Sequence, residues 1–284
     1  MKIISILNHK GGVGKTTFTG SVAQALALTG FRVLAIDNDS QHNLCSLLGV
    51  GSRSPNICDF YEARPKEASR ILLRAVRKTD LHNLHTITSS KELGDSSVKD
   101  ILYLKKHIEE CGFERYYDYI LIDNAPGIDS LQACAIHASD EIFVPTELRQ
   151  FAVDGLVEME QVIGERHPKA AQITRIIPNF YKDIKRHNTF LAVLHDLFPR
   201  RVTSTCIPLD NVFDEVVTEG KILFLHRLYS KGAAFYLKLV EELFALDEDA
   251  VWEQVSGKRR EHISTQARNR LKKSAGNKDE KQQQ

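Results

Sequence analysis

A glycine-rich loop lies near the start of the chain, between an apolar run and a stretch with helical periodicity. The run is KIISILN at residues 2–8, which is short, almost continuously apolar and typical of a buried strand. The loop reads HKGGVGKTT, and Phe18, Val22 and Leu26 then recur along one helical face before Gly30. A strand, a glycine loop and a helix in this order favour an α/β architecture.

Short apolar runs separated by helical stretches continue this pattern along the chain. The predicted strands are residues 2–8, 32–39, 84–88, 117–125, 140–147, 172–180 and 201–208. The predicted helices after the first are 66–78, 97–110, 150–165, 183–197 and 230–246. This pattern predicts a doubly wound, mostly parallel sheet with helices on both faces. We expect one domain over residues 1–247 and a basic tail over 248–284 that is helical at first and then disordered.

The net charge of the chain is close to zero, at +1, but its distribution is uneven. Residues 257–284 carry nine basic and three acidic side chains, so this tail has a net charge of +6 and the remainder has −5. The five cysteines are scattered without a C-x-x-C pair, which favours reduced thiols over a disulfide framework. No apolar run approaches about 18 residues, so no membrane span is expected. These features together predict a cytoplasmic protein.

The glycine loop has the residue types that bind a phosphate chain. Gly11, Gly12 and Gly14 let backbone N–H groups converge on anionic oxygens, and the following helix adds the partial positive charge of its N-terminus. Lys15 would bridge the β- and γ-phosphates of ATP, and the hydroxyl of Thr16 would bind Mg²⁺. The predicted nucleotide-binding residues of the loop are Gly11, Gly12, Val13, Gly14, Lys15, Thr16 and Thr17.

A second lysine, Lys10, precedes the glycines, whereas the usual P-loop would place its first glycine at His9. A loop lysine is ordinarily a solvated side chain. The segment KGGVGKTT as a whole, however, is the deviant Walker A signature, and in it the sequence resembles the ParA/MinD family of P-loop ATPases. That resemblance implies that Lys10 reaches the phosphates bound by a partner subunit, so that ATP couples to formation of a homodimer.

Two further segments resemble motifs of the same family. VLAIDNDSQHNLCSLLG matches D-x-D-P-Q-x-N with Asp37 and Asp39, and YDYILIDNAPG matches the Walker B strand with Asp123. The resemblance implies that Asp39 orients the attacking water, that Asp37 supports the Mg²⁺ site and that Asp123 binds Mg²⁺ through water. The predicted catalytic residues are thus Lys10, Lys15 and Asp39, and the predicted metal-site residues are Thr16, Asp37 and Asp123. Each aspartate taken alone would fit a helix N-cap equally well.

Later segments extend the resemblance over residues 2–245. IIPNFYKD indicates Asn179 as a contact to the adenine, and TCIPLDN resembles the nucleotide-edge loop around Pro208. The sequence departs from the family pattern at Ser40, which replaces a proline, and at residues 124–126, where N-A-P stands for [TS]-P-P. The first departure concerns the turn at Asp39. The second concerns how residues 124–126 would respond to the γ-phosphate of bound ATP.

Two positioning ATPases with different partners fit these motifs. ParA-type proteins bind DNA without sequence preference, whereas MinD-type proteins end in a short amphipathic membrane helix. The tail is basic and its apolar residues are widely spaced, which suits phosphate better than lipid. The predicted DNA-binding residues are Lys258, Arg259, Arg260, Arg268, Arg270, Lys272 and Lys273. The other basic candidates are Arg70, Arg74, Arg77, Lys78, Lys182, Lys185 and Arg186.

The resemblance also implies a partner and a location. The expected partner is a ParB-like or cargo-adaptor protein that stimulates hydrolysis, and the expected location is the nucleoid. The identity of the cargo, whether chromosome, plasmid or protein assembly, is not encoded in a recognisable motif. A tail that only increases solubility and a MinD-like membrane-associated ATPase are the alternatives.

Overall fold

Seven strands form one sheet in the computed structural model, which describes the backbone of residues 1–282 and the side chains of residues 1–266 except residue 217. The strand order is β3-β4-β2-β5-β1-β6-β7. Their bounds are β1 Lys2–Ile6, β2 Val33–Asn38, β3 Val76–Lys78, β4 Leu84–Ile87, β5 Tyr119–Asn124, β6 Glu141–Glu147 and β7 Ile173–Asn179. All neighbours pair in parallel except β3, which runs antiparallel to β4 at one edge. The predicted doubly wound, mostly parallel sheet is confirmed.

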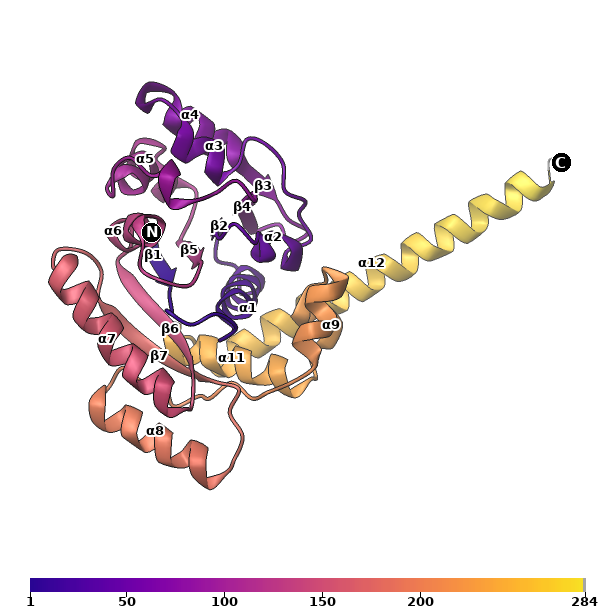
Figure 1. The fold of residues 1–284 in the computed structure, drawn as a ribbon. Coiled ribbons are helices and arrows are strands. Elements are labelled where there is room, and N and C mark those ends of the chain that lie inside the picture. The colour runs from indigo at the N-terminus through magenta and orange to yellow at the C-terminus, as the bar shows by residue number, and fades with distance from the viewer. Residues whose placement is uncertain (283–284) are drawn as a thin grey trace.

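Helices cover both faces of this sheet (Figure 1). They are α1 Lys15–Leu28, α2 Asn43–Leu47, α3 Ile57–Glu62, α4 Pro65–Ala75, α5 Tyr103–Glu110, α6 Ser130–Ala138, α7 Gln150–Arg166, α8 Lys185–Leu197, α9 Val212–Glu219, α10 Leu223–Arg227, α11 Lys231–Phe244 and α12 Glu248–Gln282, with 3₁₀ turns at Asp95–Ser97 and Phe113–Arg115. Successive strand residues point to opposite faces, so Val33 of β2 packs with α1 and α11, while Leu34 packs with α3 to α6. Both side chains are fully buried, as a doubly covered sheet requires.

Three predicted elements differ from the structure: the strand at 201–208, the helix at 66–78, and the helix at 97–110, which begins only at Tyr103. Residues 201–208 are not a strand, because the backbone N–H groups of Ser204 and Thr205 bond to the Glu242 carboxylate instead of a neighbouring strand. Its β-type pairing within the described residues is limited to isolated bridges, of Val202 with Ile176 and of Pro208 with Tyr181. The helix predicted over 66–78 ends at Ala75, and its last three residues form the edge strand β3.

The tail forms the helix α12, which leaves the body and projects outward in Figure 1. Its first turns pack on the body, since Val251 and Val255 are buried with α1, α10 and α11. The backbone remains helical through Gln282, so the helical part is longer than the sequence pattern indicates. Within the described chain, no helix is long and apolar enough to cross a lipid bilayer.

Candidate nucleotide site

The site begins at the loop between β1 and α1, where two glycines adopt left-handed backbone conformations. Gly12 has φ of 75° and Gly14, which caps α1, has φ of 88°. A Cβ atom at Gly14 would also overlap the side-chain amide of Asn179. Residues other than glycine are strained at these φ values, so the loop geometry depends on both positions. The loop wraps ahead of the α1 N-terminus, whose free N–H groups attract anions.

The ammonium group of Lys15 is buried in this loop, and its hydrogen bonds within the described chain are to backbone oxygens. Its Nζ lies 3.4 Å from the carbonyl oxygen of Asn8 and 3.2 Å from that of Lys10. Burial lowers the pKa of Lys15, and the charges of Asp123 and Asp39 partly oppose this effect. A buried cation held by neutral carbonyls would be stabilised by an anion entering the loop.

Asp37 and Asp123 lie side by side at the carboxyl ends of β2 and β5, where they are paired in the sheet register. The two oxygens of Asp123 accept hydrogen bonds from the hydroxyls of Thr16 (2.7 Å) and Thr19 (3.0 Å). Asp37 accepts bonds from the backbone N–H (3.1 Å) and the thiol (3.0 Å) of Cys45. These contacts bring together the predicted metal-site residues Thr16, Asp37 and Asp123 and place all three beside the phosphate loop.

Burial gives both carboxyl groups an unusual affinity for protons. Desolvation raises the pKa of Asp123 to about 7, and the neighbouring charge of Asp37 adds to the effect. Desolvation raises the pKa of Asp37 to about 6, although its hydrogen bonds to Cys45 oppose the shift. Two adjacent carboxylates with raised pKa values are an environment that a divalent cation would stabilise.

Asp39 follows the end of β2 and is only partly buried. Its carboxylate accepts the N–H of Gln41 at 2.9 Å, and its carbonyl accepts the N–H of His42 at 3.0 Å. These bonds close a turn in which Ser40 takes the place of the family's proline, so the turn forms without that residue. Asp39 thereby faces the open side of the loop, in contrast to the buried Asp37 and Asp123.

A cavity of about 640 Å³ lies between the phosphate loop and the turn at Asp39. Its floor is formed by Gly11, Gly12 and Gly14 with Lys15, Thr16 and Thr17, and its far wall includes Asp39, Ser40, Asn179, Phe180 and residues 209–211. Asn179, the predicted adenine contact, lines the cavity, and its amide donates to the carbonyl oxygen of Val13 at 2.8 Å. Pro208, the other predicted nucleotide contact, is buried and does not line the cavity. The residues that follow it, Leu209 and Asp210, line the cavity instead.

Lys10 is exposed and lies outside this cavity. Its Nζ forms an ion pair of 2.9 Å with Glu147 at the end of β6, and Glu147 also lies 3.3 Å from Arg149. The two lysines of the loop therefore have different environments. Lys15 is enclosed within its own subunit, and Lys10 stands at the surface.

The residues present fit a nucleoside triphosphate with Mg²⁺. The loop supplies backbone donors and a buried ammonium group for phosphates, and the pair of buried carboxyl groups beside the Thr16 hydroxyl supplies oxygen ligands or water acceptors for Mg²⁺. The cavity volume falls within the range of small-molecule sites.

Comparison with known proteins agrees with this geometry. A family model described as an AAA domain matches residues 1–174. The chromosome partitioning protein ParA of Caulobacter vibrioides is 30% identical over 262 residues, which cover 88% of this chain and 96% of that protein. The chain belongs to the ParA/MinD family of P-loop ATPases.

Other relatives agree with this assignment. The sporulation initiation inhibitor protein Soj of Bacillus subtilis is 29% identical over 255 residues, covering 86% of this chain and 98% of Soj. The solved structure of the cell division ATPase MinD of Pyrococcus furiosus matches with a TM-score of 0.71 and 26% sequence identity. The match covers 87% of the present chain and 99% of the MinD chain. Its relatives make this protein a partition or positioning ATPase.

Several residues of the site were not predicted from the sequence. Thr19 lies one helical turn after Thr16, and this spacing was the available signal that it shares Asp123. Cys45 and Glu147 gave no such signal, because their contacts with Asp37 and Lys10 depend on the tertiary fold. Asn124 is explained by its partner, since the buried amide of Asn38 donates to it at 2.8 Å across the paired strands.

The predicted DNA-binding residues of the tail have unequal roles. Lys258 is exposed but lies 3.2 Å from Glu261, and Arg260 is exposed. Arg259 stacks over the ring of Tyr229 at 5.0 Å, so its side chain helps to anchor α12. The side chains of Arg268, Arg270, Lys272 and Lys273 lie outside the described residues. In the body, Arg77 is buried and bonded to backbone carbonyls, which removes it from the surface candidates.

Exposed basic residues also gather next to the nucleotide cavity. A second, smaller cavity of about 290 Å³ is lined by Arg149, Lys182 and Arg186, and it shares Asn179, Phe180 and Leu209 with the larger one. This basic surface lies at the N-terminal end of α8, on the same edge of the sheet as the phosphate loop.

Proposed function

We propose that this protein is a ParA-like, Mg²⁺-dependent ATPase that forms an ATP-sandwich homodimer and binds DNA without sequence preference. Hydrolysis returns it to a state that releases DNA, and the cycle segregates or positions DNA or another cargo. Residues 1–247 form the ATPase domain in this proposal, and residues 248–284 form a DNA-contacting tail. The single observation that carries the proposal is the placement of Lys10, which is exposed outside its own cavity.

The placement of Lys10 supports an action in trans. The ammonium group of Lys10 is paired with Glu147 at the surface. The ammonium group of Lys15 lies inside the loop, where the phosphates of the same subunit would bind. A second subunit facing the cavity would present its own Lys10 to the phosphates from outside. Each site would then be complete only in the dimer, and closure of the dimer would exclude water from the reacting groups.

The remaining residues have separate roles in this mechanism. The loop N–H groups and Lys15 bind the phosphates, and Thr16 with the carboxyl groups of Asp37 and Asp123 holds the cation site. Asp39 faces the cavity and orients the attacking water by accepting its hydrogen bond. Mg²⁺, when bound, neutralises charge on the phosphates during transfer to water.

DNA binding would act through phosphate contacts made by paired basic surfaces. In a dimer, two copies of the tail and of the surface at Lys182 and Arg186 act together, so weak contacts combine into strong binding. Monomers would carry only half of these contacts. A ParB-like or cargo-adaptor protein would stimulate hydrolysis, and the protein would be cytoplasmic and associated with the nucleoid.

Filter binding to duplex DNA and sedimentation with acidic liposomes, each with ATP and with ADP, test the choice of partner. We expect binding to DNA of any sequence with ATP and Mg²⁺, and much weaker binding with ADP. ATP-dependent binding to liposomes with no DNA binding would overturn this proposal and support a MinD-like ATPase at the membrane.

A further inference from the structure

A third cavity, of about 680 Å³, is comparable in size to the nucleotide cavity and lies at the opposite end of the sheet from it. Its lining residues Arg32 and Tyr117 lie just before the starts of β2 and β5, and Asp37 and Asp123 lie at the other ends of these strands. The length of the strands therefore separates the two sites. Nothing in the proposed ATPase mechanism uses this cavity, so its residues need a different explanation.

One wall of the cavity is apolar, and much of it is accessible. Phe113 and Tyr116 contribute aromatic rings, and Leu73 and Val76 contribute aliphatic side chains from α4 and β3. Tyr116 is 61% exposed and Leu73 is 46% exposed, whereas Phe113 is buried. Such a surface would be stabilised by an apolar group that removes it from water.

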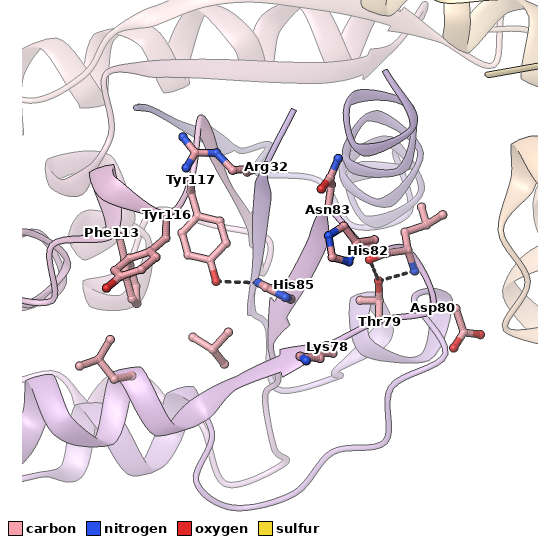
Figure 2. Close-up of a pocket in the computed structure, with 13 residues that line it drawn as sticks. Arg32, Lys78, Thr79, Asp80, His82, Asn83, His85, Phe113, Tyr116 and Tyr117 are labelled. Carbon is pink, nitrogen blue, oxygen red and sulfur yellow. Dashed lines mark hydrogen bonds between the residues drawn. The ribbon is translucent and has the colours of Figure 1, made fainter. Parts of the chain in front are cut away.

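Hydrogen-bond donors face this apolar wall. Lys78 of β3 and His85 of β4 are directly paired across the two antiparallel strands, so their side chains lie on the same face as Val76. Figure 2 shows the aromatic rings of residues 113–117 on one side of the cavity and the polar side chains of residues 78–83 on the other. A ligand in the cavity would contact both surfaces.

The Tyr117 hydroxyl lies 2.9 Å from Nδ1 of His85 and forms a hydrogen bond with it. Burial raises the pKa of Tyr117 to about 12, so the hydroxyl keeps its proton and can donate it to Nδ1. Burial, together with the charges of Lys78 and His82, lowers the pKa of His85. A neutral His85 that accepts at Nδ1 must carry its proton on Nε2, which is then a free donor.

The charged groups around the cavity favour an anion at Lys78. Arg32 is neutralised by Asp118, with contacts of 2.7 and 3.2 Å. Lys78 has no ion pair among the described side chains. Asp80 also lines the cavity, but Figure 2 shows it on the far side of Thr79, away from the Tyr117–His85 pair.

We propose that this cavity binds a small organic anion whose apolar body packs on Phe113, Tyr116 and Val76 and whose anionic head contacts Lys78 and His85. The volume is that of a site for a small molecule of drug-like size. A carboxylate and a phosphate monoester would satisfy the same donors. The assignment is independent of the DNA binding proposed for the tail and for the surface at Lys182 and Arg186, because it uses none of those residues.

Fluorescence titration with 8-anilinonaphthalene-1-sulfonate, an aromatic anion, tests this site in the full-length protein. We expect saturable binding of one probe per chain that saturating ATP with Mg²⁺ does not displace. Decanoate or decyl phosphate should displace the probe, and whichever does so at lower concentration identifies the preferred head group. Decanol has the same chain without the charge and should compete at least tenfold less well.

Three variants make the result specific to the cavity. Lys78→Glu should weaken probe binding about tenfold, because it replaces the unpaired cation with a negative charge that repels the anionic probe. Val76→Trp should fill the space and abolish binding. Lys66→Glu makes the same charge change on the exposed first turn of α4, outside the cavity, and should bind the probe as the wild type does. Circular dichroism and ATP binding would verify the fold of each variant.

Absence of saturable probe binding to the wild type would overturn the proposal. So would displacement of the probe by ATP, or unchanged affinity in both Lys78→Glu and Val76→Trp. If these two variants instead altered the mass of the protein in solution without altering probe affinity, the cavity would be a protein contact and the proposal would be wrong.

Discussion

At the scale of single residues, Gly14 is the position at which the phosphate loop tolerates least change. Its φ of 88° disfavours any side chain, and an added Cβ would overlap the Asn179 amide that holds the Val13 carbonyl. Gly14→Ala should therefore weaken ATP binding by at least tenfold. Gly11→Ala is the matched control, since its Cβ would meet only Pro126 at an ordinary 3.7 Å. Titration with a fluorescent ATP analogue compares the two, and equal loss in both variants would contradict this account of the loop.

The pair of buried carboxyl groups makes a prediction about pH. An aspartate in the unfolded chain titrates near pH 3.9, and burial raises the pKa of Asp123 to about 7. The stability associated with the protonated form is therefore fully present below about pH 4 and is lost as the pH rises through about 7. Asp123→Asn removes this loss, because its side chain is neutral at every pH. Its amide oxygen can accept a hydrogen bond from one of the Thr16 and Thr19 hydroxyls, and its amide N–H can donate to the other.

Thermal unfolding without nucleotide measures the effect. Asp123→Asn should raise Tm at about pH 8 by several degrees, corresponding to roughly 1–4 kcal/mol, and by little at about pH 4. Asp118→Asn is the control with the opposite sign, because its bonds to Arg32 lower the pKa of Asp118. A gain in Tm for Asp123→Asn that was independent of pH would show that the carboxyl group is not the cause.

At the scale of elements, local patterns predicted six strands and the longer helices, because buried parallel strands have continuous apolar runs. The segments 201–208 and 76–78 were assigned wrongly for tertiary reasons. In residues 201–208, the Glu242 carboxylate accepts a backbone N–H that a neighbouring strand would otherwise bind. In residues 76–78, the guanidinium of Arg77 donates to the carbonyl oxygen of Pro55. The phosphate loop could be predicted from its glycines and lysine between a strand and a helix, and the carboxylates beside it from their resemblance to family motifs. The contacts of Lys10 with Glu147 and of Asp37 with Cys45 join distant elements and were not.

The helix α12 gives a prediction for DNA binding. Val251 and Val255 anchor its first turns, so deletion of residues 257–284 removes the basic part and leaves this packing in place. Each phosphate contact contributes about 0.9 to the slope of log K against log[salt]. The deletion should weaken DNA binding and flatten that slope by roughly two to four units if a similar number of contacts comes from two tails.

A matched variant distinguishes the tail from the surface near the nucleotide cavity. Replacement of Lys182, Lys185 and Arg186 by alanine removes the exposed basic residues at the start of α8. If this variant loses DNA affinity while the tail deletion does not, the DNA site lies on the body. The ATPase cycle proposed here would stand, and the role assigned to the tail would be wrong.

At the scale of the whole molecule, the account depends on two lysines acting in different subunits. Lys15 serves the cavity of its own chain, and Lys10 serves the cavity of the partner. Lys10→Ala should therefore bind ATP and remain a monomer. Asp39→Ala should bind ATP, lose turnover and accumulate as a dimer, because only the carboxylate that orients water is removed. Steady-state phosphate release and binding of a fluorescent ATP analogue complete the comparison.

Light scattering coupled to size exclusion, with ATP and Mg²⁺ in the running buffer, measures whether each variant is a monomer or a dimer. The Asp39→Ala protein should have twice the mass of the 32.1 kDa chain with ATP and the mass of one chain with ADP. Lys10→Ala should have the mass of one chain in both nucleotides. A monomeric Asp39→Ala protein with ATP bound, or a dimeric Lys10→Ala protein, would contradict the account.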